Sequence, residues 1–168
     1  MSLCPSFIFG PSSALSSSSE TNVHGNYQQP PSKSFSLSFV GSWLRGEAPV
    51  QSRLCVDVRD VAKAHVRAGT LDGTVGQRFI ISSEARISSE KMAKELKRIA
   101  ATSDSSRIDA DKITCDTVFD GGAIKIGDKE VECSDRMKES LGGLVCRSVE
   151  ETMADMAKSL LVMEKQSA

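Results

Sequence analysis

Two carboxylates, Asp57 and Asp60, stand three residues apart where a short apolar run gives way to a helical pattern. Paired acids could share proton-transfer work. The same spacing at a helix start also suits an N-cap and an acid that stabilises the first-turn dipole, and we favour this structural role. His65 falls on the predicted helix face with Val61 and Ala64, where we expect a packed or hydrogen-bonded imidazole.

The cysteines and histidines do not form a metal-ligand pattern. The five cysteines are scattered, without a CxxC pair, and His24 and His65 lie far apart. We therefore predict no metal site and, from the odd number of cysteines, reduced thiols in a cytoplasmic protein. Organelle import stays open because the apolar residues 3–9 precede a serine-rich stretch, yet that run is too short for a membrane span.

The overall charge excludes one class of partner and leaves another open. A net charge of −1 and an isoelectric point near 6.1 give no basic field for nucleic acid. The 168 residues, 39% hydrophobic and 26% charged, are enough for one core, so we predict a single domain over residues 1–168. We leave a dimer open.

The elements that would position these residues alternate between strand and helix. Residues 3–11 predict one buried parallel strand closed by Gly-Pro, residues 12–33 a polar loop, and residues 32–46 a helix. A strand over 53–58 leads into a helix that Asp57 caps and Gly69 ends. A further strand centres on residues 79–81.

The second half of the chain is predicted to be mainly helical. A helix over 87–100 has Ser88 as its cap and Ile87 and Met92 as a staple, and a small hairpin spans 123–131. Two helices follow, over 134–143 and 148–164, the second with Ser148 and Glu151 as a capping box and a methionine-rich core stripe. The class is α/β, with too few strands for a complete sheet.

Four segments, in order, resemble one enzyme family. LCPSFIFGP is similar to the strand and turn after the active-site helix of extended short-chain dehydrogenases/reductases, and VDVRDVAKAHVRA resembles a signature of the dihydroflavonol and cinnamoyl-CoA reductase branch within the NAD-dependent epimerase/dehydratase group. GQRFIISSEARISSEKMAKEL looks like the next strand and helix, and SDRMKESLGGLVCRSVEETMADMAKSLL like the C-terminal helix pair. The resemblance runs from residue 2 to about 163 and is weak over 100–130.

The resemblance implies two devices that this sequence does not contain. The family holds the cofactor pyrophosphate on a glycine-rich turn, and no GxGxxG motif occurs here. The family also uses a tyrosine as general acid, with a lysine four residues later. The single tyrosine, Tyr27, has Pro31 at that spacing, and Lys33 lies six residues on, so the two cannot share a helical face.

The resemblance carries some site residues across by position. Pro5, Ser6 and Phe7 match the segment whose backbone lies along the nicotinamide of NAD or NADP, although the end of a buried strand explains them equally well. Tyr27, with Asn22 and His24, matches the loop that covers the substrate in the family. We favour the simpler interpretation that these side chains are solvated in a loop. Arg53 matches an arginine that binds substrate phosphate in sugar-nucleotide members, and we favour a surface ion pair.

The sequence thus predicts a truncated domain: a late Rossmann strand (1–11), a loop (12–33), and the remaining Rossmann elements with the small α/β substrate domain (34–168), the N-terminal dinucleotide-binding half being absent. The resemblance implies NAD(P)-dependent oxidation or reduction at CH–OH/C=O groups, with a small-molecule carbonyl or alcohol as the substrate. We expect this chain to be inactive alone and to expose an apolar sheet edge. Two alternatives remain, namely a non-catalytic binding or regulatory paralogue and half of a sugar-nucleotide epimerase or dehydratase.

Overall fold

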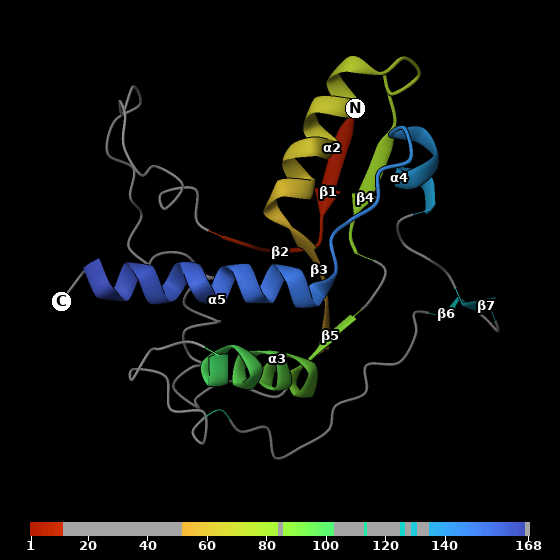
Figure 1. The fold of residues 1–168 in the computed structure, drawn as a ribbon. Coiled ribbons are helices and arrows are strands. Elements are labelled where there is room, and N and C mark those ends of the chain that lie inside the picture. Colours follow the sequence, from red (N-terminus) through yellow and green to blue (C-terminus); the bar gives the residue numbers. More distant parts are fainter. Residues whose placement is uncertain are drawn as a thin grey trace.

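The computed structural model describes residues 1–11, 52–83, 86–102, 113, 125–126, 129–130 and 135–166. They form a mixed α/β fold with short parallel sheets, as predicted (Figure 1). The strands are β1 (Ser2–Pro5), β2 (Phe7–Phe9), β3 (Ser52–Asp57), β4 (Arg78–Ile81), β5 (Arg86–Ser88), β6 (Lys125–Ile126) and β7 (Lys129–Glu130). The helices are α2 (Val58–Thr70), α3 (Ser89–Thr102), α4 (Asp135–Ser140) and α5 (Val149–Gln166).

The prediction of one continuous buried strand over residues 3–11 is wrong. The run divides at Ser6: β1 pairs in parallel with β4, whereas β2 pairs in parallel with β3. The ladder to β4 runs past Pro5 to the Ser6 amide, which bonds to the Ile81 carbonyl, and the chain then changes partners. Most of β1 is exposed, while β2 ends in buried Phe9. One short run therefore joins two sheets.

Gly10 ends this run at a close approach between two elements. Its φ is 138°, in the region that favours glycine, and an added Cβ would lie 2.8 Å from Cγ1 of Val58 at the start of α2. The Gly10 amide also points to the sulfur of Met156 in α5, 3.5 Å away. The Gly-Pro turn predicted here thus brings β2 against two helices.

The helix that follows Asp57 begins where the sequence predicts and ends later than predicted. Asp57 is the N-cap of α2, and Asp60 lies in the first turn. The predicted stop at Gly69 is wrong because the helix runs on to Thr70, with the Leu71 amide bonded to the Arg67 carbonyl. His65 is exposed and so does not share the buried face of Val61 and Ala64, but its imidazole is hydrogen-bonded as predicted, with Nδ1 donating to the Val61 carbonyl at 2.8 Å.

The later elements follow the predicted order. The small hairpin is present as β6 and β7, with Ile126 opposite Lys129. Helix α4 ends at two glycines of positive φ, and the Gly143 amide bonds to the Lys138 carbonyl at 2.8 Å. At the start of α5, the Glu151 amide bonds to the Ser148 hydroxyl at 3.1 Å, as a capping box requires. Among the described elements, the sequence did not predict β5, which is three residues long.

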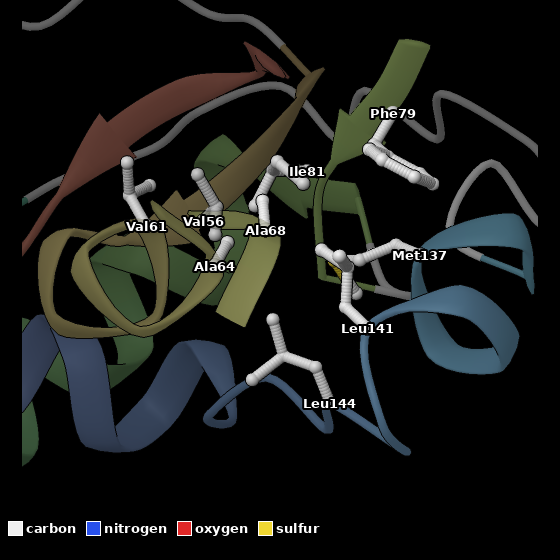
Figure 2. Close-up of a cluster of buried hydrophobic side chains, with 9 residues drawn as sticks. All are labelled: Val56, Val61, Ala64, Ala68, Phe79, Ile81, Met137, Leu141 and Leu144. Carbon is white, nitrogen blue, oxygen red and sulfur yellow. The ribbon is translucent and has the colours of Figure 1, made fainter. Parts of the chain in front are cut away.

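One hydrophobic cluster joins α2, β3, β4 and α4. Helix α2 lies along β1 and β4, and α4 lies next to β4 (Figure 1). The side chains converge between these elements, and all are less than a tenth exposed: Val56, Val61, Ala64, Ala68, Phe79, Ile81, Met137, Leu141 and Leu144 (Figure 2). Ala64 and Ala68 are part of this cluster, and their small side chains let α2 pack closely against the strands.

Several predictions lie outside the described residues. They are the loop over 12–33, the helix over 32–46, and the staple side chains of Ile87 and Met92.

The packing of Phe79 gives a stability prediction. Phe79 is fully buried in the cluster, so Phe79→Ala removes a ring and leaves a cavity, which should lower the free energy of unfolding by about 3–5 kcal/mol. Urea unfolding followed by circular dichroism measures the change. Val75→Ala is the control, because Val75 is 89% exposed and its truncation should cost little. Equal losses in the two variants would mean that this cluster is not the core.

Candidate functional site

The carboxyl ends of β1 and β4 lie side by side and present hydroxyl groups. The Ser6 amide donates to the Ile81 carbonyl at 3.0 Å, which extends the parallel ladder by one bond. The Ser6 hydroxyl then donates to the Ser82 hydroxyl at 3.1 Å. Ligands of open parallel sheets bind outside the carboxyl ends of the strands, so this edge is the first place to seek a site.

A cavity of about 260 Å³ opens beside Ser82. Its walls come from the residues after β4, from α4, and from the loop that leads into α5. The lining residues are Ser82, Ser83, Met137, Lys138, Val145, Cys146, Arg147, Ser148, Val149 and Glu150. The lining combines hydroxyl groups and charged side chains with apolar side chains, a combination typical of pockets for small organic ligands.

The two serines at the cavity floor are held in fixed positions. Ser83 donates to the Cys55 carbonyl twice, from its hydroxyl at 2.7 Å and from its amide at 2.8 Å. Ser82 donates to the carbonyl of Ser83 at 3.1 Å, and both serines are buried. Since each hydroxyl proton is used inside the protein, these groups can offer a ligand their oxygen lone pairs.

Asp60 fixes the loop that forms the opposite wall. Its carboxylate is fully buried and accepts from the Arg147 backbone amide at 2.7 Å and from the Arg147 guanidinium. Arg147 also donates to Glu151 at 3.1 Å, and Lys63 lies 3.9 Å from Asp60. A buried carboxylate must be paired, so this contact ties the cavity loop to α2. Arg147 is thereby engaged within the protein.

Asp57 makes the second buried connection. Its two oxygens accept from the Arg59 guanidinium at 2.8 and 2.9 Å and from the Arg59 amide at 2.8 Å. Arg59 continues to Asp155 of α5 at 2.9 Å. Burial raises the pKa of the Asp57 carboxyl, but the hydrogen bonds from Arg59 and Thr152 outweigh it, so the pKa lies below its usual range. The bond to Asp57 raises the pKa of Arg59.

These contacts support the structural reading of the paired acids. Asp57 caps α2 and links it to α5, and Asp60 pins the cavity loop. Both carboxylates accept hydrogen bonds from arginines, so neither is placed to exchange protons with a ligand. The paired acids therefore position the site without lining the cavity.

The structure describes some of the candidate binding residues and not others. Pro5, Ser6 and Phe7 lie at the junction of the two sheets, and Ser6 touches the cavity wall through Ser82. Tyr27, Asn22 and His24, and the Arg53 side chain, lie outside the described residues; the Arg53 backbone pairs with Ile87.

The sequence missed the cavity itself. Ser82, Ser83, Lys138 and Cys146 come from segments up to 64 residues apart, and no local spacing marks them as one site. Cys146, half buried, contacts the Ser82 carbonyl at 3.6 Å between sulfur and oxygen. Within the described residues, no three side chains of the metal-binding types come together.

Comparisons with known proteins show the fold. A scan against protein-family models found no match, and a search of curated proteins found none either. Among solved structures, the chain is similar to yeast methylglyoxal/isovaleraldehyde reductase Gre2 complexed with NADPH (24% identity, TM-score 0.60, 97% of this chain and 47% of that one). It is also similar to Gre2 from Candida albicans in complex with NADPH (22%, 0.59, 96% and 43%).

A third structure widens the range of activities that share this fold. UDP-glucose 4-epimerase from Thermotoga maritima, with UDP-glucose, matches at 19% identity and TM-score 0.53, over 99% of this chain and 46% of the other. The chain thus spans less than half the length of the structures it matches. The fold is that of the reductase and epimerase group that the sequence resembled, and it corresponds to a part of those proteins. No helix in the described part is long and apolar enough to cross a membrane.

The low pKa of Asp57 gives a pH prediction. A carboxyl with a lower pKa folded than unfolded stabilises the fold above its unfolded pKa, near 4, and this share is lost as pH falls through the folded pKa. Asp57→Asn keeps a capping side chain but loses the charge pair, so it should cost about 2–3 kcal/mol at pH 7. The difference from wild type should narrow below about pH 4.

Urea unfolding at several pH values measures this effect. Asp72→Asn is the control, since Asp72 is an exposed carboxylate in the turn after α2. A difference between wild type and Asp57→Asn that stays constant down to pH 2 would contradict the assignment.

The Asp60 contact predicts how the cavity loop responds. Asp60→Asn places an amide group against donors of Arg147, so the loop should loosen and Cys146 should react faster with a thiol reagent. Peptide-resolved mass spectrometry gives the rate for each cysteine. Buried Cys55 is the internal reference, because its rate rises only if the whole fold opens. Glu95→Gln, which breaks an exposed pair on α3, should change neither rate.

Proposed function

We propose that this chain forms the substrate-domain portion of an NAD(P)-dependent oxidoreductase that acts on CH–OH/C=O groups. The observation that carries the proposal is the junction of β1 and β4, where Ser6 bonds to Ser82 beside the cavity. The carboxyl ends of parallel strands and a small mixed-polarity cavity meet there. In Gre2, whose structures contain NADPH, the same fold serves a reductase.

The cavity supports a small carbonyl or alcohol as its ligand. Its volume of about 260 Å³ suits a molecule of a few heavy atoms, and its walls include Met137, Val145 and Val149. The lone pairs of Ser82 and Ser83 can accept a hydrogen bond from an alcohol, and the apolar walls exclude water from the remaining surface. A nucleotide sugar is much larger, so the cavity favours the reductase reading over the epimerase reading.

The residues near Ser6 fit one end of a nicotinamide cofactor. Pro5 has no amide hydrogen and the Ser6 amide is bonded to Ile81, so a carboxamide could meet the backbone of these two residues only by donating to their carbonyls. The sequence has no glycine-rich turn for the pyrophosphate. When bound, the cofactor would supply the hydride. This chain's own part is to position the substrate and shield it from water.

The residues that line the cavity include no tyrosine or histidine to act as general acid in carbonyl reduction. The titratable side chains that line the cavity are those of Lys138, Cys146, Arg147 and Glu150, without a tyrosine or histidine. Arg147 is held by Asp60 and Glu151, and Tyr27 has no lysine at the required spacing. A reductase needs such an acid to protonate the developing alkoxide. We therefore infer binding without turnover in the isolated chain.

This division between binding and turnover can be tested directly. The purified chain should show no NADPH-dependent reduction of methylglyoxal or isovaleraldehyde, measured by absorbance at the nicotinamide band. Saturation-transfer NMR should nevertheless detect binding of isovaleraldehyde and its alcohol, with a Kd of about millimolar or weaker for so small a ligand.

Two matched variants locate the binding. Val145→Trp should abolish the signal, because Val145 lines the cavity and is 72% exposed, so a larger side chain there covers the mouth without disturbing the core. Val75→Trp, at an exposed position in the turn before β4, should leave it unchanged. Turnover by the chain alone would overturn the inference that the isolated chain is inactive. Binding of UDP-glucose but of neither carbonyl compound would favour the epimerase alternative.

A further inference from the structure

The inner part of the cavity wall consists of two hydroxyl groups and two apolar side chains. Ser82, Ser83, Met137 and Val149 line the cavity and are each less than a tenth exposed. Val145 also lines the cavity but is 72% exposed, so it lies at the mouth. A ligand that fills the inner part therefore needs one polar end and an apolar remainder.

The hydrogen bonds of Ser82 determine which end of a ligand lies against it. Its hydroxyl donates to the Ser83 carbonyl at 3.1 Å and accepts from the Ser6 hydroxyl at 3.1 Å. A serine hydroxyl has one proton and two lone pairs, so the second lone pair of Ser82 can accept from the hydroxyl of an alcohol. An alcohol bound in this way leaves its hydrocarbon chain to the apolar side chains of Met137 and Val149.

Met137 belongs both to the cavity wall and to the hydrophobic cluster. Its side chain extends from α4 into the cluster, and the residue is 1% exposed (Figure 2). Methionine is unbranched and flexible, and it fills irregular gaps between better-defined side chains. Shortening Met137 should therefore lengthen the cavity toward the core, whereas shortening Val145 only widens the mouth.

We propose that Met137 sets the length of the aliphatic carbonyl or alcohol that the cavity accepts. The inference rests on the proposed function and narrows its substrate class to short aliphatic chains with one polar end. A longer chain must either displace Met137 from the cluster or extend past Val145 into water. Burying one methylene group strengthens binding about fourfold, so affinity should rise with chain length only until the chain reaches Met137.

Straight-chain primary alcohols, from ethanol to octanol, test the proposal. Saturation-transfer NMR gives the Kd of each alcohol for the purified chain. With wild type, the Kd should fall about fourfold for each added carbon and then stop falling at a limiting length. Met137→Ala removes the thioether and its methyl group, so the limit should move up by about two carbons. The first alcohol at the new limit should bind Met137→Ala about tenfold more tightly than wild type.

Two further variants separate a change in cavity length from a general loss of packing. Met153→Ala is the matched control, because Met153 is a fully buried methionine of α5 that does not line the cavity. It should leave the limiting length unchanged. Met137→Val makes a smaller truncation, which should move the limit by about one carbon and serves if Met137→Ala does not fold. Circular dichroism shows which variants are folded.

The outcomes distinguish this inference from the proposed function. A limiting length that is the same in wild type and the folded Met137 variants would overturn the role of Met137, and so would an equal shift in Met153→Ala. Either result would leave binding of small alcohols by the cavity intact. Binding of no alcohol by wild type would overturn both proposals.

Discussion

The buried carboxylates of Asp57 and Asp60 set the geometry on which the site depends. A carboxylate in the interior is tolerated only with strong partners, and both acids find them in arginines from the chain around them. Asp60 reaches 87 residues along the sequence to the backbone and side chain of Arg147. Asp57, through Arg59, reaches Asp155. The position of α2 thus determines where α5 begins and where the cavity loop runs.

The change of partners at Ser6 is the second constraint. A strand with one partner would belong to one sheet, and its carboxyl end would be followed by an ordinary turn. Here β1 ends against β4 and β2 continues against β3, so the junction lies beside Ser82 and Ser83. Cys55 of β3 accepts both donors of Ser83, which joins the two sheets across the floor of the cavity. The cavity therefore exists because two sheets meet there.

The sequence predicted elements better than contacts. Caps and apolar spacing depend on neighbours in the chain, so Asp57, the Ser148–Glu151 box and the hairpin could be identified locally. The break at Ser6 could not be identified in this way, because a continuous run of apolar residues does not reveal that the strand changes its pairing partner. Gly69 failed as a stop because Thr70 and Leu71 still find helical hydrogen-bond acceptors. The cavity was out of reach, since its walls come from segments that only packing brings together.

The cavity is anchored entirely by contacts within the described structure. Its walls come from residues that are held by Asp60, by the Cys55 carbonyl and by the hydrophobic cluster. The shape of the cavity therefore depends on how α2, β4 and the loop before α5 pack against one another.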